Sequence, residues 1–193
     1  KNNALALAQN DLVLSLDADE ALDERLQQSI LSAKKNKMAA GYTMNRCTYY
    51  CGRFIRHGAW YPDRKLRLFS RQLAQWGGTN PHDKVEFHSP QTSNHLAGDI
   101  LHYSYYTMEE HITQNNKFST IAAESYFSRG KKTSLFRIWF NPCWAFFSGF
   151  ILRGGFLDGF YGYVIARNVA HLTFMKHSKL YLLQRKVTNG KNE

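Results

Sequence analysis

The stretch Asp11-Leu-Val-Leu-Ser-Leu-Asp17-Ala-Asp19-Glu20 decides the fold, because it is a short apolar run that ends in closely spaced acids. The apolar residues 12–16 predict a buried strand. Asp17 and Asp19 would follow its carboxyl end, where open α/β sheets bind their ligands. Alternate side chains of an extended segment point the same way, so this pair can hold a Mg²⁺ or Mn²⁺ that also binds phosphate. The stretch therefore predicts a nucleotide diphosphate site in an α/β domain.

Two other kinds of acidic site are excluded by the residues that follow. An EF-hand calcium loop would need Asp or Asn at position 21 and Gly at position 22, where this chain has Ala21 and Leu22. A phosphatase of the haloacid-dehalogenase type would need Thr or Val in place of Ala21.

The rest of the chain predicts alternating helical and extended segments. Thr107 and Glu110 form a capping box, which predicts the start of a helix that ends at Gly130. Periodicity and turn residues give the other expected elements: helices over 1–9 and 21–36, a β-rich segment over 40–56, a strand over 65–69 and a loop over 77–81.

Positive charge is concentrated in the last third of the chain. The net charge is +10, and from Arg129 onward eleven Lys and Arg face two acids, whereas the first 128 residues are nearly neutral. Residues 134–183 mix this charge with many aromatic side chains. Their apolar runs are broken by charged residues and Pro142, so we expect no transmembrane helix but an amphipathic segment in a membrane interface. Aromatic packing in a helical core is the alternative.

Two further features of the composition concern compartment and partners. Three cysteines without a second pair of metal ligands indicate reduced thiols in a cytoplasmic protein. The basic, aromatic composition also suits a nucleic-acid binder, but no known nucleic-acid motif is present and the basic residues stand among apolar ones. We expect no nucleic-acid partner.

Several motifs resemble one enzyme family, the family-two glycosyltransferases with the GT-A fold, and more narrowly the bacterial lipopolysaccharide-core β-glucosyltransferases. The resemblance covers nearly the whole chain, apart from the opening part of the family's domain. It is carried by these segments: residues 1–2 before an Ala-rich helix, 14–20 (LSLDADE), 62–69 (PDRKLRLF), 81–83 (PHD), 100–104 (ILHYS) and 153–160 (RGGFLDGF).

The resemblance implies an α/β fold, a GT-A (Rossmann-like) nucleotide-sugar transferase core that is incomplete at its N-terminus. Residues 1–106 would be the C-terminal portion of this catalytic domain. Residues 107–193 would be a helical, basic, aromatic-rich extension on the membrane and acceptor side.

The resemblance also implies a donor site with a metal. The donor would be bound by Asp17, Asp19, Lys1 and Arg67. The Mg²⁺ or Mn²⁺ would be held by Asp19 and Asp17, with His102 as a further candidate ligand. Two alternatives stay open. His102 stands in an apolar setting, where a histidine is usually a core residue. The basic face of the strand over 65–69, which includes Arg67, can be solvated instead of binding the donor.

For the catalytic base, the first candidate is Asp83 and the second is Glu86. Asp83 can alternatively cap a loop, and Glu86 can be an exposed strand residue. Glu20 is expected either to cap the following helix or to contact the donor-binding residues. Trp60 and Trp76 are expected to stack on sugar rings or to pack in the core.

The implied function is transfer of a hexose, glucose being favoured, from a UDP-sugar to the lipopolysaccharide inner core with inversion. The acceptor would be a lipid-linked core oligosaccharide, and the protein would be peripheral on the anionic inner face of the cytoplasmic membrane. Two alternatives are a non-catalytic peripheral-membrane binding module and a GT-A transferase that acts on another polysaccharide or lipid acceptor.

Overall fold

The computed structural model describes residues 1–35, 39–78 and 83–189, and these form two compact units. The sheet unit contains Lys1–Tyr49 and Tyr61–Ser104. The helical unit contains Tyr50–Trp60 and the chain from Tyr105 onward. The predicted domain boundary after residue 106 stays a prediction, and the compact units additionally join residues 50–60 to the helices.

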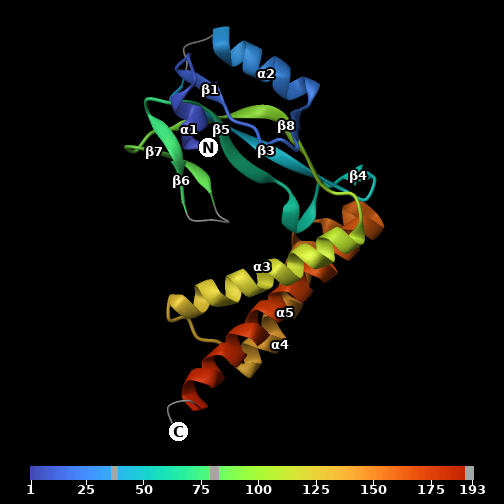
Figure 1. Ribbon diagram of the computed structural model, residues 1–193. Coiled ribbons are helices and arrows are strands. Elements are labelled where there is room, and N and C mark those ends of the chain that lie inside the picture. Colours follow the sequence, from blue (N-terminus) through green and yellow to red (C-terminus); the bar gives the residue numbers. More distant parts are fainter. Residues whose placement is uncertain (36–38, 79–82, 190–193) are drawn as a thin grey trace. The chain divides into compact units, whose positions relative to one another are not determined.

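The sheet unit is built on a sheet with the strand order β1-β5-β3-β8-β2 (Figure 1). The strands β1 and β3 both pair antiparallel with β5, and β2 pairs antiparallel with β8. A separate antiparallel hairpin is formed by β6 and β7. The bounds are β1 Leu12–Leu14, β2 Glu20–Leu22, β3 Gly41–Tyr50, β5 Asp63–Ser70, β6 Ala74–Gly77, β7 Lys84–Phe87 and β8 Ser93–Tyr105.

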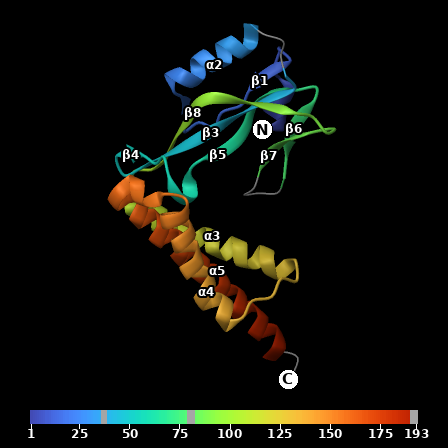
Figure 2. The same cartoon turned by 180° about the vertical axis from the view of Figure 1, so that it is seen from behind.

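Helix α2 (Glu24–Lys35) covers one face of this sheet (Figures 1 and 2). Its fully buried Leu26 packs in the main core cluster of the unit, with Ile30 and Ala33 against the same cluster. The buried sheet residues of that cluster are Tyr42, Met44, Leu68, Leu96 and Ile100. The combination of a sheet with helices confirms the predicted α/β class.

The first elements differ from the prediction at their ends. Strand β1 is half-buried, because it is the first strand in the order and its described pairing is with β5. Residues 21–22 are strand, since β2 pairs with β8, and helix α2 starts only after Asp23, whose carboxylate accepts a hydrogen bond from the Leu26 N–H at 2.7 Å. Helix α1 is shorter than predicted (Asn2–Ala6). Position 36, the predicted end of the second helix, and most of the loop predicted over 77–81 lie outside the described residues.

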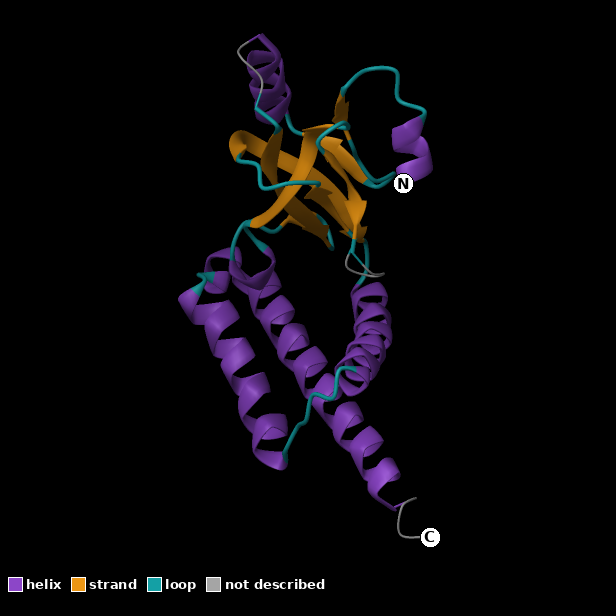
Figure 3. Cartoon of the chain, turned by 90° about the vertical axis from the view of Figure 1, so that its left-hand side faces the viewer, coloured by secondary structure: helices purple, strands orange, loops and turns teal. Residues whose placement is uncertain are grey.

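The helical unit consists mainly of α3 (Met108–Ser128), α4 (Leu135–Phe147) and α5 (Gly159–Asn189), with α5 in contact with both α3 and α4 (Figure 3). The predicted capping box is confirmed, since the Thr107 hydroxyl accepts from the Glu110 N–H and the Glu110 carboxylate accepts from the Thr107 N–H. Short elements complete the unit: β4 (Arg53–Phe54), a 3₁₀ turn over Gly58–Trp60, a π-helical turn over Ser148–Leu152 and a 3₁₀ turn over Gly155–Asp158.

Helix α4 carries an exposed stripe of aromatic side chains. We call this stripe the aromatic face; it consists of Phe136, Trp139, Phe140, Trp144 and Phe147. Trp139 is 70% exposed, so the alternative that these aromatics pack in a helical core is wrong for them. The expected absence of a transmembrane helix rests on breaks in the apolar runs, and these breaks still leave one stretch that is long and apolar enough for a span. Judged by length and composition alone, one stretch of the described chain, Leu135–Leu152, could cross a membrane, and 6% of it is buried.

Candidate functional site

The acid pair lies in the turn that connects β1 with β2. Two hydrogen bonds hold this turn: the Glu20 N–H donates to the Asp17 carbonyl at 3.0 Å, and the Asp17 N–H donates to the Glu20 carboxylate at 3.0 Å. The turn therefore fixes the backbone of Asp17 while both carboxylates remain within reach of neighbouring strands.

Two cationic side chains bind Asp17. The Lys1 ammonium lies 2.9 Å from one carboxylate oxygen, and the Arg67 guanidinium donates to the other at 2.8 Å. Partial burial works to raise the pKa of Asp17, but the hydrogen bonds from Lys1 and Arg67 outweigh it, so its pKa lies below the usual value. Asp17 is therefore a carboxylate at neutral pH, and both its oxygens are engaged.

Arg67 is buried rather than solvated, so the solvated-face alternative is wrong for it. The same guanidinium nitrogen that binds Asp17 also donates to Glu20 at 2.9 Å. The Glu20 side chain is fully buried, and Arg46 lies 3.8 Å away from it. Glu20 thus contacts a predicted donor-binding residue, whereas Asp23 supplies the helix-capping hydrogen bond.

Arg46 was not predicted from the sequence as a member of the charged cluster around Asp17 and Glu20. Arg46 stands opposite Asp63 in the register of β3 and β5, and its guanidinium donates to the Asp63 carboxylate at 3.0 Å. This contact depends on the register between strands that are separated in sequence, for which the sequence carries no local signal.

Trp76 lies beside the cationic groups of the cluster. The Lys1 ammonium is 4.0 Å and the Arg67 guanidinium 5.2 Å from the centroid of its ring, both within the range of cation–π attraction. Asn2 exchanges two hydrogen bonds with the Trp76 backbone. Within the described residues the second terminal nitrogen of Arg67, Nη1, is buried and has no hydrogen-bond acceptor. A buried donor without an acceptor is costly, which makes this nitrogen a candidate contact for an anionic ligand.

His102 on β8 faces the second acid of the pair, with its Nε2 3.2 Å from the Asp19 carboxylate. Burial lowers the pKa of His102 below its usual value, and the charge of Arg46 lowers it further. His102 is therefore neutral at neutral pH, the state in which imidazole binds metals. To bind a metal through Nε2, the neutral His102 ring must carry its proton on Nδ1. Nδ1 is buried and has no hydrogen-bond partner among the described residues.

The donor set fits a divalent ion only in part. Across the described ranges, no group of three or more His, Cys, Asp and Glu side chains could hold a metal. Mg²⁺ needs only one or two protein carboxylates when phosphate and water complete its shell. Asp19, whose side chain is 50% exposed, fits that role together with His102. Asp17 instead has its oxygens on Lys1 and Arg67, so its role as a ligand stays a prediction.

The two predicted bases lie on or beside β7. Asp83 is exposed directly before the strand, next to residues 79–82, which lie outside the described part of the chain. Glu86 forms a surface ion pair with Lys84 at 2.9 Å. In the described chain, none of the hydrogen bonds and ion pairs joins either acid to Asp17 or Asp19, and both catalytic roles stay predictions.

Trp60 belongs to the helical unit, where it packs in an aromatic core. Its ring stacks on Tyr105 and meets the rings of Tyr50 and His111 edge-on. Core packing, one of the two alternatives, thus accounts for Trp60.

The chain is similar to bacterial glycosyltransferases over almost its full length, although no family model matches it. It is 30% identical to an uncharacterised glycosyltransferase of Rickettsia felis, over 93% of this chain and 67% of that protein. An uncharacterised glycosyltransferase of Rickettsia prowazekii is 28% identical, over 98% of this chain and 68% of that protein.

A further relative is named for its pathway. The lipopolysaccharide core biosynthesis glycosyltransferase LpsC of Rhizobium meliloti is 25% identical, over 94% of this chain and 67% of that protein. Identity and coverage together show the family, and this chain belongs to the glycosyltransferases.

Proposed function

We propose that this chain carries the metal-dependent donor site of a family-two, GT-A glycosyltransferase. The enzyme transfers a hexose, glucose being favoured, from a UDP-sugar to the lipopolysaccharide inner core with inversion. The observation that carries the proposal is the cluster around the acid pair, in which Lys1 and Arg67 contact Asp17 while Asp19 remains half exposed. The name of the Rhizobium relative supports a lipopolysaccharide acceptor.

The charge balance of the cluster supports the involvement of a divalent cation. Followed through all its ion pairs, the cluster has equal numbers of cationic and anionic side chains, with Lys1, Arg46, Lys65 and Arg67 against Asp17, Asp19, Glu20 and Asp63. A diphosphate adds negative charge to this neutral set, and neutral His102 does not offset it. A Mg²⁺ or Mn²⁺ ion held by Asp19 and His102 would supply the missing positive charge and neutralise the departing diphosphate.

The residues of the chain then have separate roles. Arg67 has one donor left, Nη1, which is buried and can bind a phosphate oxygen only after the acid turn moves to admit the donor, and Lys1 lies at the edge of the site against the ring of Trp76. In the transfer, a bond forms between the acceptor oxygen and the anomeric carbon as the bond to the diphosphate breaks. The acceptor proton passes to Asp83, which is preferred because Glu86 is paired with Lys84.

The test is UDP release by the full-length enzyme with a lipopolysaccharide-core acceptor. Asp19→Asn keeps the shape of the side chain but removes its charge, so we expect activity to fall ~100-fold or more. Glu24→Gln, an exposed acid at the start of α2, is the matched control and should retain activity. Full activity in the Asp19 variant would contradict the proposed donor site.

The proposed base is tested in the same assay. Asp83→Asn should lower kcat by about 10²–10⁴ with little change in donor affinity, and Glu86→Gln should have a smaller effect. The reverse order would assign the base to Glu86.

The exposed aromatic face favours a second candidate, a non-catalytic peripheral-membrane binding module. The Asp19 variant separates the two, because it should lose transfer and keep vesicle binding. Absence of transfer from any UDP-sugar by the wild-type enzyme, with vesicle binding intact, would favour the binding module.

A further inference from the structure

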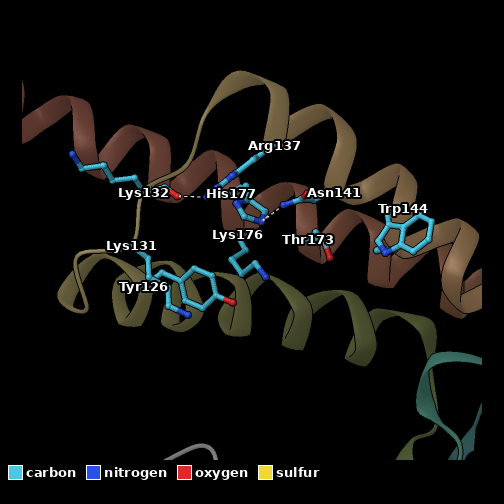
Figure 4. Close-up of a pocket in the computed structure, with 10 residues that line it drawn as sticks. Tyr126, Lys131, Lys132, Arg137, Asn141, Trp144, Thr173, Lys176 and His177 are labelled. Carbon is cyan, nitrogen blue, oxygen red and sulfur yellow. Dashed lines mark hydrogen bonds between the residues drawn. The ribbon is translucent and has the colours of Figure 1, made fainter.

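A cavity of about 530 Å³ opens between α3, α4 and α5 within the helical unit (Figure 4). Cationic side chains dominate its lining: Lys131, Lys132, Arg137 and Lys176. The lining includes neither Asp nor Glu, and none of these four cations makes an ion pair within the described part of the chain. The cavity is therefore a concentrated positive site without an internal counter-charge.

Two of the cations share one aromatic ring. The ammonium groups of Lys131 and Lys176 lie 4.7 Å and 5.0 Å from the centroid of the Tyr126 ring. In Figure 4, Tyr126 extends from α3 and Lys176 from α5 toward the same space. Cation–π attraction offsets only part of the repulsion between two like charges. An anion between them would remove that repulsion.

The other polar groups of the cavity are held in place by internal hydrogen bonds. Buried His177 lies 3.0 Å from the Thr133 hydroxyl and 2.9 Å from the Asn141 side-chain nitrogen. Burial lowers the pKa of His177, and Lys176 and Arg137 lower it further, so the ring is neutral at neutral pH. Arg137 donates to the Lys132 carbonyl at 2.9 Å. These bonds pre-organise the site, which reduces the entropy lost on binding.

We propose that this cavity binds the phosphate headgroup of an anionic membrane lipid. A phosphate monoester has nearly two negative charges and several acceptor oxygens, which match a set of Lys and Arg donors. The lipid source is favoured because Trp144 both lines the cavity and belongs to the aromatic face of α4. Exposed tryptophans settle at the membrane–water interface, so the headgroup can enter the cavity while its chains stay in the bilayer. The proposal rests on the proposed function, because a transferase that acts on a lipid-linked lipopolysaccharide core works at a membrane surface.

The test measures sedimentation of the full-length protein with vesicles that contain either phosphatidic acid or phosphatidylserine at equal surface charge. The wild type should prefer phosphatidic acid. Lys131→Gln/Lys176→Gln should lose about 30-fold in affinity for phosphatidic acid vesicles, at about 1 kcal/mol for each charge. The matched control, Lys117→Gln/Arg153→Gln, removes two exposed charges of the same unit outside the cavity and should keep the preference. Lys131→Arg/Lys176→Arg keeps the charges and should keep it also.

The outcomes separate the cavity from the membrane location. Equal loss in the pocket and control variants, or wild-type binding without a preference for phosphatidic acid, would overturn the headgroup site and leave the membrane location intact. Failure of the wild type to bind any anionic vesicle would overturn both. Inorganic phosphate is the soluble arm. If the wild type binds inorganic phosphate in solution while Lys131→Gln/Lys176→Gln binds phosphatidic acid vesicles as tightly as the wild type, the ligand is free phosphate and the lipid source is wrong.

Discussion

Arg67 is the residue on which the acid cluster depends most, because one of its nitrogens serves both Asp17 and the buried Glu20. Arg67→Ala would leave the buried Glu20 carboxylate with the hydrogen bond from the Asp17 N–H and with only the more distant Arg46 as a cation. Removing one partner of a buried ion pair costs about 3–5 kcal/mol, and we expect a loss of that size in urea unfolding at neutral pH. Arg64→Ala removes an exposed arginine of the same strand and should change stability by less than about 0.5 kcal/mol. Equal effects would contradict the assigned role.

His111 makes the stability of the helical unit sensitive to pH. It is 1% exposed, contacts the Tyr50 hydroxyl at 3.2 Å, and burial lowers its pKa to about 4 from an ordinary 6.5. The unfolded chain therefore binds a proton that the folded chain excludes. The contribution of His111 to the free energy of unfolding is fully present above pH 6.5. It is lost as the pH drops toward 4, which lowers the free energy of unfolding by up to about 3 kcal/mol.

The measurement compares urea unfolding of the wild type and His111→Asn across this range. Asparagine does not titrate, so the variant should lose the His111 part of the pH dependence. Above pH 7 the two unfolding free energies should run parallel. An unchanged slope between pH 6.5 and 4 in the variant would sink the assignment.

At the scale of elements, strand β8 and helix α2 meet at Gly98. This residue has a φ of +106°, and a Cβ there would clash with the Leu26 backbone nitrogen and lie 2.7 Å from the Asp23 carboxylate. Gly98→Ala must therefore push the helix away from the strand, at a cost expected to exceed 3 kcal/mol (roughly that of a large core disruption) in urea unfolding. Gly52→Ala is the control, because Gly52 has a φ of +103° but nothing within 4 Å, and should cost only about 1 kcal/mol.

The same elements explain what could be read from the sequence. The capping box at Thr107 and the extended segment over 65–69 are local patterns, and the structure confirms both, although burial does not alternate along β5. Local patterns do not give strand pairing, so residues 21–22 were assigned to a helix although their partner is β8. The acid pair was located by its spacing, but Arg46 and the buried state of Arg67 follow from the register of β3 and β5. For the aromatics of α4 the sequence left core packing open as an alternative to an interfacial segment, and their exposure excludes core packing for them.

At the scale of the whole molecule, charge and exposed aromatic surface coincide in the helical unit. The excess of basic residues begins at Arg129, and the aromatic face lies on α4 in the same part of the chain. Anionic lipids attract such a basic segment, and aromatic side chains anchor it in the interface. The same stretch, Leu135–Leu152, also has the length and composition of a span, so the two modes of membrane attachment need separate tests.

We expect an interfacial attachment, because Arg137 stands in the first turn of α4, the cationic cavity runs along the helix from Arg137 to Trp144, and Asn141 and Pro142 interrupt its apolar surface. Alkaline carbonate extraction of membranes should therefore release the protein into the soluble fraction, whereas a spanning helix resists extraction. Trp139→Ser, which removes the most exposed aromatic of α4, should weaken vesicle binding several-fold, since it removes about 1–2 kcal/mol of apolar insertion. Glu124→Gln, an exposed substitution on α3, should not weaken it. Retention of the wild type in the carbonate pellet would show that Leu135–Leu152 crosses the bilayer.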